Sequence, residues 1–159
     1  PIFDVRDEDA EATTLFQVNS YGWVGINTMS PSRRLSVNGD AGGTSAWNND
    51  SDERLKTNIN TIENALDKVL TLRGVQFEWI DTENHPEGPQ IGFIGQETVD
   101  IVPEVVEEKG GYYSMQYAPI TAVLVEAVKE VKAEKDKEIA TLKATVKALM
   151  KRLEALEKE

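Results

Sequence analysis

The sequence predicts an α+β chain in three parts: a β-rich stem over residues 1–50, a small mixed α/β unit over residues 51–118, and a long helix over residues 119–159. Short strand-forming runs separated by turn signals rich in Asn and Gly fill the first part. The hydrophobic period switches from helical to alternating in the second part, and it becomes a heptad repeat in the third.

The composition narrows the classes of function. The 159 residues carry 28 acidic and 17 basic side chains, a net charge of -11, which argues against nucleic acid or an anionic membrane as a partner. With no Cys and a single His, His85, the chain has no thiolate or two-histidine metal site, and we expect neither metal nor cofactor. An aromatic content of 7% gives one chain only a modest core, which favours an oligomer.

Three short strands are expected in the stem. Residues 15–18, 23–26 and 34–37 are rich in strand-forming side chains and are separated by turn sequences. Because strands this short bury little apolar surface alone, we expect the stem to wind around identical neighbours. Residues 40–50 are small and polar apart from Trp47, and they are expected to form an exposed linker.

A helix is expected early in the middle unit. Apolar residues recur at helical spacing over residues 62–70, and the pattern ends near Leu72. Asn60 and Glu63 have the spacing of a capping box at its start, and Gly74 is expected to stop it in the left-handed conformation.

Short strands are expected to follow this helix. Residues 75–79 alternate between apolar and polar side chains, which predicts a strand, and residues 91–94 predict a short buried strand. Residues 81–90 contain Pro and Gly and are expected to form a loop. A short helix over residues 96–102 and a hairpin within residues 105–117 complete the unit.

The last part is expected to form a parallel coiled coil. From residue 139 onward, apolar residues occupy positions a and d of three successive heptads. These residues are Ile139, Leu142, Val146, Leu149, Leu153 and Leu156. In a parallel assembly Glu138 would face Lys143 of a neighbour, and Arg152 would face Glu157. An upstream apolar set within residues 124–131 follows another phase across a charged run, which indicates a stutter or a functional break, and residue choice leaves dimer and trimer open.

Ser51 and Lys56 form the one nucleophile and base pair that the sequence places close together in a suggestive context. A serine hydroxyl needs a base to remove its proton, and a neutral lysine amine can serve. Residues five apart lie about 140° apart around a helix and on opposite faces of a strand, so a dyad needs a bend between them. Spacing alone favours the simpler interpretation, with Ser51 as a turn or cap residue and Lys56 as a solvated charge.

Four ordered blocks, at residues 51–59, 74–79, 91–106 and 117–130, make the interpretation more specific. Together they resemble the C-terminal intramolecular chaperone domain of phage tail spikes and tail fibres. That family of self-cleaving serine peptidases includes the endosialidase chaperone domain and the corresponding domain of myelin regulatory factor. Residues 24–39 are similar to the stem repeat often found before such domains.

The resemblance implies a role for each residue of the first block. Ser51 would be the nucleophile and Lys56 its general base, and the bond cut would be Asp50–Ser51. Asp52 and Arg54 match the motif and would have an orienting or structural role. Relatives often carry a His just before the central block, whereas the single His of this chain lies in the expected loop, so no catalytic role is expected for it.

The resemblance also implies a function. The domain would form a homotrimer, bring the upstream fibre stem of the same chains into register and then release itself, which traps the stem kinetically. The stem would belong to a virion tail fibre or spike, and the released domain to the host cytoplasm during assembly. We expect cleavage to wait for trimerisation.

Two other classes of function stay open. One is a non-cleaving trimeric fibre tip or adhesin, in which Ser51 and Lys56 are inert. The other is a diffusible hydrolase that acts on other chains, although the sequence shows no substrate-cleft motif.

Overall fold

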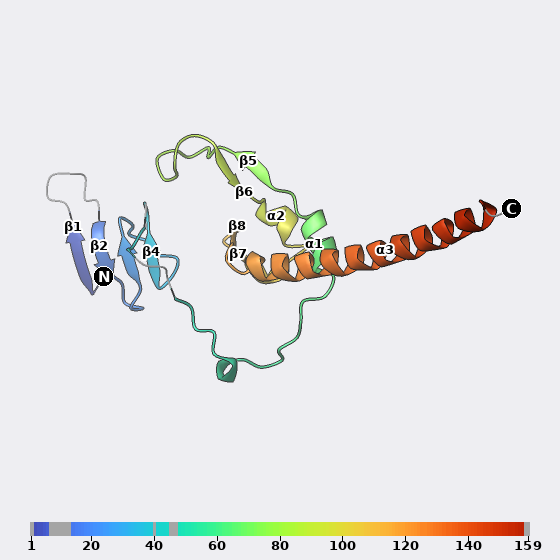
Figure 1. Ribbon diagram of the computed structural model, residues 1–159. Coiled ribbons are helices and arrows are strands. Elements are labelled where there is room, and N and C mark those ends of the chain that lie inside the picture. Colours follow the sequence, from blue (N-terminus) through green and yellow to red (C-terminus); the bar gives the residue numbers. More distant parts are fainter. Residues whose placement is uncertain (1, 7–13, 40, 45–47, 158–159) are drawn as a thin grey trace. The chain divides into compact units, whose positions relative to one another are not determined.

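The computed structural model describes residues 2–6, 14–39, 41–44 and 48–157. The chain divides into two compact units, residues 1–52 with 78–89 and residues 53–77 with 90–159. Small sheets and one long helix give an α+β fold, as the sequence predicts (Figure 1). No helix in the described part of the chain is long and apolar enough to cross a membrane.

The first unit contains a four-stranded sheet in the order β1-β2-β3-β4, formed by Phe3–Arg6, Thr14–Val18, Val24–Ile26 and Leu35–Val37. Strand β2 pairs antiparallel with β1 and β3, whereas β3 and β4 are parallel. The three strands expected from the sequence are confirmed, and β1 is an addition that the sequence analysis did not predict. Around Trp47, residues 45–47 lie outside the described residues, and residues 41–44 and 48–50 are exposed, as expected for a linker.

One face of this sheet is apolar. The strand registers place eight apolar side chains directly opposite one another across the four strands. These residues are Phe3, Val5, Phe16, Val18, Val24, Ile26, Leu35 and Val37. Several of them are exposed in the single chain, including Phe3 and Leu35. The sheet therefore has an apolar face that one chain alone does not cover.

The other face of the sheet is held by a buried glutamine. The side-chain amide of Gln17 donates a hydrogen bond to the carbonyl oxygen of Thr28 at 2.9 Å, and Gln17 is only 5% exposed. Gly25 lies beside this contact, and a Cβ at that position would come within 2.5 Å of the Thr28 oxygen. A glycine is therefore required at the centre of β3.

The second unit contains helices α1 (Ala65–Thr71), α2 (Gly95–Thr98) and α3 (Ile120–Leu156) and two small antiparallel sheets. Strands β5 (Val75–Phe77) and β6 (Gln90–Gly92) form one sheet, and β7 (Val106–Lys109) and β8 (Tyr112–Met115) form the other. Two short 3-10 helices, η1 (Glu53–Leu55) and η2 (Pro103–Val105), complete the unit. The hydrophobic core consists of Ala65, Val102, Val105, Ile120, Val123 and Ala127.

The predicted elements of this unit are recovered with shifts in their limits. The hairpin is confirmed, with Gly110 and Gly111 at positive φ in its turn. The predicted buried strand at residues 91–94 is shorter, and Ile91 is exposed because it lies on the face opposite Val75 and Phe77. The short helix expected at residues 96–102 is the four-residue α2.

Helix α1 ends close to the predicted Leu72, but its start and both of its predicted caps differ from the prediction. It starts at Ala65 after Asn64, which has a φ of 54°, so the predicted capping box of Asn60 and Glu63 is wrong. Its last residue is Thr71, and Leu72 follows as the C-cap in extended conformation. Gly74 is not at positive φ, because the chain continues directly into β5.

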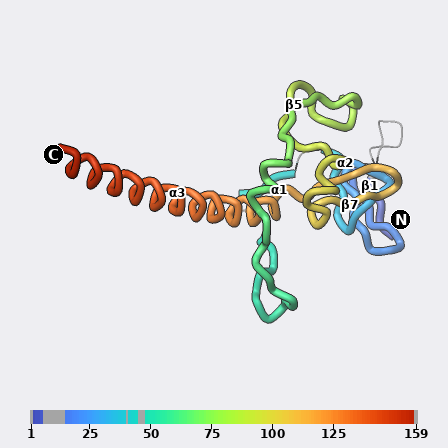
Figure 2. The backbone as a smooth tube through the Cα atoms, turned by 90° about the vertical axis from the view of Figure 1, so that its right-hand side faces the viewer, coloured from blue at the N-terminus to red at the C-terminus, as the bar shows by residue number. Residues whose placement is uncertain are grey.

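Helix α3 is continuous through the charged run (Figure 2). Ion pairs within the helix join Lys132 to Asp136 and Lys135 to Glu138 across this stretch. The change of phase therefore does not interrupt the helix, and the predicted stutter or functional break at this point stays a prediction. From residue 131 to residue 157 every residue is exposed in the single chain.

Candidate cleavage site

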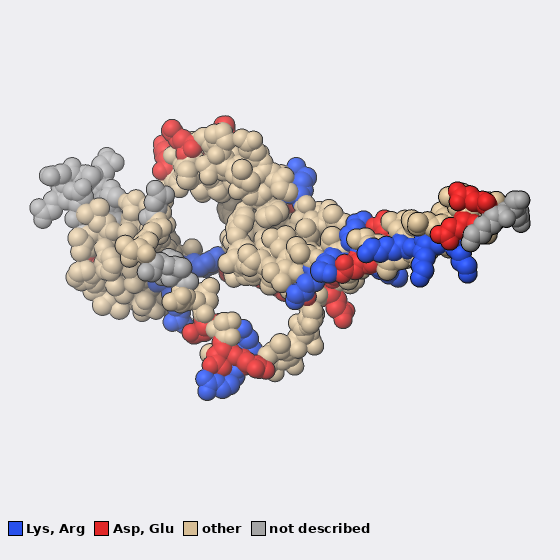
Figure 3. All heavy atoms as spheres, in the orientation of Figure 1, with Lys and Arg blue, Asp and Glu red and all other residues tan. Residues whose placement is uncertain are grey.

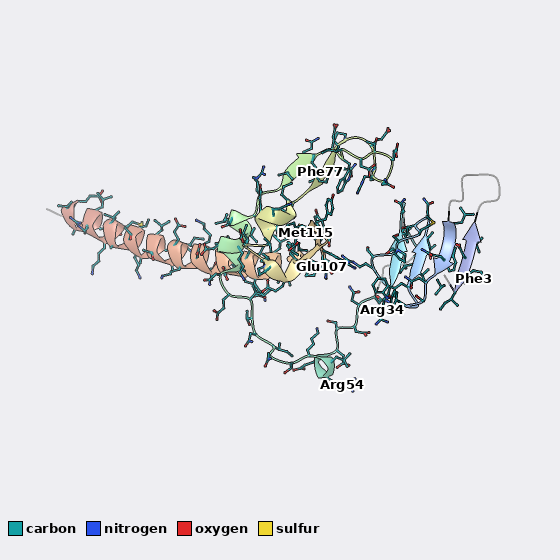
Figure 4. All side chains as sticks on the ribbon, turned by 180° about the vertical axis from the view of Figure 1, so that it is seen from behind. Phe3, Arg34, Arg54, Phe77, Glu107 and Met115 are labelled. Carbon is teal, nitrogen blue, oxygen red and sulfur yellow. The ribbon has the colours of Figure 1, made fainter. Side chains whose placement is uncertain are left out.

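The candidate cleavage site lies in an exposed segment, residues 48–61, which contains only the short helix η1. The backbone N–H of Lys56 donates to the carbonyl oxygen of Glu53 at 3.0 Å and closes this turn. Figure 4 shows Arg54 on η1. Helix η1 thus lies between Ser51 and Lys56 in the sequence, where a dyad would need a bend.

The structure places all five predicted site residues in this segment with exposed side chains. These residues are Asp50, Ser51, Asp52, Arg54 and Lys56. The division between the two compact units falls after Asp52, so Ser51 and Lys56 belong to different units. The segment also carries two exposed apolar side chains, Leu55 at 71% and Ile59 at 61% exposed. Neither the dyad nor these apolar groups are buried within a single chain.

Glu130 is a residue that the sequence reasoning missed. Its carboxylate accepts the backbone N–H groups of Ala65 at 3.0 Å and of Leu66 at 2.8 Å. These are N–H groups that a helix start leaves without an intrahelical partner, and Asn64 supplies no side-chain cap. Glu130 thus joins α3 to the start of α1, the helix that follows the candidate cleavage segment. A signal exists in the sequence, because Glu130 comes three residues after the buried Ala127, on the same face of α3.

Tyr117 and Gly92 form a second contact that fixes the unit. The Tyr117 hydroxyl accepts the backbone N–H of Phe93 at 3.2 Å, and the two rings lie 5.9 Å apart. A Cβ on Gly92 would come within 2.5 Å of this hydroxyl oxygen. The glycine in the central block therefore leaves room for this hydroxyl, which would have to shift to admit a side chain.

An exposed ion pair joins the end of α1 to α2. Arg73 binds the Glu97 carboxylate through two nitrogens, at 3.0 Å and 2.5 Å. This hydrogen bonding, aided by the charge of Arg73, lowers the pKa of Glu97 below its ordinary value. The same hydrogen bonding, aided by the charge of Glu97, raises the pKa of Arg73.

The loop over residues 78–89 belongs to the first unit with the stem strands. The Asn38 side-chain amide, just after β4, donates to the Asn84 side-chain oxygen at 3.1 Å. Asn84 in turn donates to Asp81, and this hydrogen bond lowers the Asp81 pKa. His85 stacks on Trp79 with ring centroids 4.1 Å apart.

Comparison with known proteins defines the class of this segment. Residues 51–107 match the family model of peptidase S74, described as the chaperone of endosialidase. The family predicted from the four blocks is confirmed, and the match begins at Ser51.

Three viral proteins are similar to the chain. The long tail fiber proteins Gp37 of Enterobacteria phages K3 and T2 are each 38% identical to it over 92 residues, which is 52% of this chain and 7% of each relative. The uncharacterized protein VP1 of Micromonas pusilla reovirus is 41% identical over 63 residues, 38% of this chain and 3% of that protein. The chain thus spans less than a tenth of the length of these relatives.

Proposed function

We propose that residues 1–50 are the end of a virion tail fibre or spike stem and that the rest of the chain is its intramolecular chaperone. The chaperone trimerises, sets the register of the stem, and then separates by cutting the Asp50–Ser51 bond. The observation that carries this proposal is the start of the family match at Ser51, directly after an exposed linker. The similarity to two long tail fiber proteins supports the fibre stem as its partner.

Exposed apolar surface supports assembly with other copies of the chain. The six apolar heptad residues between Ile139 and Leu156 are exposed, and so is part of the apolar face of the stem sheet. Burial of apolar surface stabilises association by roughly 25 cal/mol for each Å² removed from water. Figure 3 shows Lys and Arg gathered along α3, where residues 139–153 contain four basic and no acidic side chains. Two of them, Lys143 and Arg152, are those expected to pair with Glu138 and Glu157 of neighbouring chains in a parallel coil.

The stem contact supports a role in setting register. The loop over residues 78–89 lies in the same unit as the stem strands, and it receives the Asn38 hydrogen bond directly after β4. Pairing of strands between chains is slow because its contacts are non-local. A chaperone that holds the stem end in each of three joined chains raises the local concentration of the strands that must pair.

The proposed chemistry needs a covered site. Ser51 Oγ adds to the carbonyl carbon of Asp50, and Lys56 takes the hydroxyl proton and passes it to the departing amide nitrogen. Lys56 accepts that proton only as a neutral amine, and removal from water disfavours its ammonium form. Since the side chains of Ser51 and Lys56 are both exposed in one chain, neighbouring chains must shield them from solvent. Exposed Leu55 and Ile59 are suitable contacts for it.

Mass spectrometry of freshly expressed protein tests the proposal. We expect a fragment that begins at Ser51, and we expect Ser51→Ala to stay intact while it assembles normally. If the unaltered chain also stays intact after assembly, autoproteolysis is refuted, and the domain serves as a permanent trimeric fibre tip.

A further inference from the structure

We infer that the side-chain carboxylate of Asp50 completes the cleavage, by converting the Ser51 ester into a cyclic anhydride that water then opens. This inference rests on the proposed autoproteolysis and concerns its second half. The attack by Ser51 leaves the two fragments joined through an ester, and something must break that ester before the chaperone can leave the stem.

The position of Asp50 suits this step. Its carboxylate and the carbonyl that it must attack belong to the same residue, so closure gives a five-membered ring. Two of the three staggered χ1 rotamers place the carboxylate carbon gauche to that carbonyl carbon. Asp50 is exposed, and residues 48–52 form neither helix nor strand, so no regular hydrogen-bond ladder fixes this carbonyl.

Lys56, which is neutral again after the first step, could also activate water in this segment, and direct hydrolysis through it is the route that the isotope labelling below distinguishes. The single histidine, His85, lies in the loop of residues 78–89, where it stacks on Trp79. Intramolecular groups held in reacting geometry reach effective concentrations of about 10⁵–10⁸ M. A carboxylate within the same residue can therefore compete with water for this carbonyl carbon.

The bonds balance at each step. After the first step, Asp50 C′ is bonded to Ser51 Oγ, and the Ser51 nitrogen is a free amine. A carboxylate oxygen of Asp50 then adds to C′, the C′–Oγ bond breaks, and Oγ takes a proton from solvent. The fragments are now separate, and one ends in a succinic anhydride. Water adds to either anhydride carbonyl and two protons leave to solvent, which restores the side-chain carboxylate and creates the new terminal one.

Isotope labelling distinguishes this route from direct hydrolysis of the ester. Protein labelled with ¹³C-aspartate is allowed to cleave in H₂¹⁸O, and the ¹³C spectrum of the peptide ending in Asp50 locates the oxygen by its isotope shift. Direct hydrolysis places ¹⁸O on C′ alone, whereas opening of the anhydride also places it on the side-chain Cγ. We expect label at both carbons, and label confined to C′ overturns the inference.

Variants of Asp50 give an independent readout. We expect Asp50→Ala to slow separation by at least about tenfold and to accumulate a full-length species that hydroxylamine cleaves, because the ester forms but lacks its internal nucleophile. Asp50→Glu closes a less favourable six-membered ring and should fall between Ala and Asp. Asn49→Ala, in the same exposed linker, is the matched control and should cleave normally.

The outcomes separate the two proposals. Cleavage of Asp50→Ala at the normal rate without accumulated ester refutes the role of Asp50 and leaves autoproteolysis standing. An unaltered chain that forms neither ester nor fragments refutes autoproteolysis, and the role of Asp50 fails with it.

Discussion

Replacing Glu130 by Ala is expected to destabilise the second unit because it removes the only side-chain cap seen at the start of α1 in the described structure. Two backbone N–H groups lose their acceptor, at 3.0 Å and 2.8 Å. Ala65 is completely buried, so water does not easily replace the carboxylate at its N–H group. Loss of a cap costs about 1 kcal/mol, and a buried donor without a partner costs about 1–3 kcal/mol. We therefore expect a loss of about 2–3 kcal/mol.

Urea unfolding at one fixed protein concentration measures this loss, since the stability of an oligomer depends on concentration. Glu130→Gln keeps one acceptor oxygen and should lose about half as much. Glu134→Ala removes an exposed carboxylate one turn further along α3 and should change stability by less than about 0.5 kcal/mol. If Glu130→Ala behaves like Glu134→Ala, the cap contributes nothing and the reasoning is refuted.

Three further predictions concern packing, pH and catalysis. Gly92→Ala should destabilise the second unit because the new Cβ would lie 2.5 Å from the Tyr117 hydroxyl oxygen. In a double-mutant cycle measured by thermal unfolding, Tyr117→Phe should relieve part of that loss, and additive effects of the two substitutions would contradict the contact. The pKa of the Glu97 carboxyl, measured by NMR, should lie below the ordinary Glu range, so its contribution to stability is present above the pKa of the unfolded state and is lost as pH falls through the pKa of the folded state. Arg73→Ala should return the Glu97 pKa toward its usual value, and an unchanged titration midpoint would contradict the pairing. Lys56→Arg should assemble but not cleave in a mass-spectrometric time course, because a guanidinium stays protonated; normal cleavage would remove Lys56 as the base.

The parts of the fold that depend on local pattern could be predicted from the sequence. Patterns that span only a few neighbouring residues, namely alternation, turn residues and helical spacing, predict strands β2 to β4, the β7–β8 hairpin and helix α3. The start of α1 could not be predicted in this way, because its cap comes from Glu130, 65 residues further along the chain than Ala65. Exposure of Ile91 likewise depends on which face of a two-stranded sheet the unit covers.

The sequence motif of residues 51–59 predicts the candidate site, whereas the spacing of Ser51 and Lys56 alone does not. A separation of five residues predicts no shared face on a helix or a strand, and the structure has Ser51 and Lys56 exposed and in different units. If neighbouring chains complete the site, as proposed, no hydrophobic pattern is expected around its residues in one chain. Glu130 is different, because an acidic residue on the buried face of α3 indicates a polar contact, although the sequence does not identify the start of α1 as its partner.

The most direct test of the account measures cleavage and assembly together. The unaltered chain and a Leu142→Asp, Leu149→Asp variant are followed over a range of concentrations, with sedimentation for the oligomeric state and intact mass for the Asp50–Ser51 bond. Charges in the seam oppose association, so the variant should stay monomeric and uncut although Ser51 and Lys56 are present. The account predicts that fragments beginning at Ser51 arise from the trimer of the unaltered chain alone. Cleavage at full rate in a verified monomer, or a stable trimer that never cuts, would contradict it.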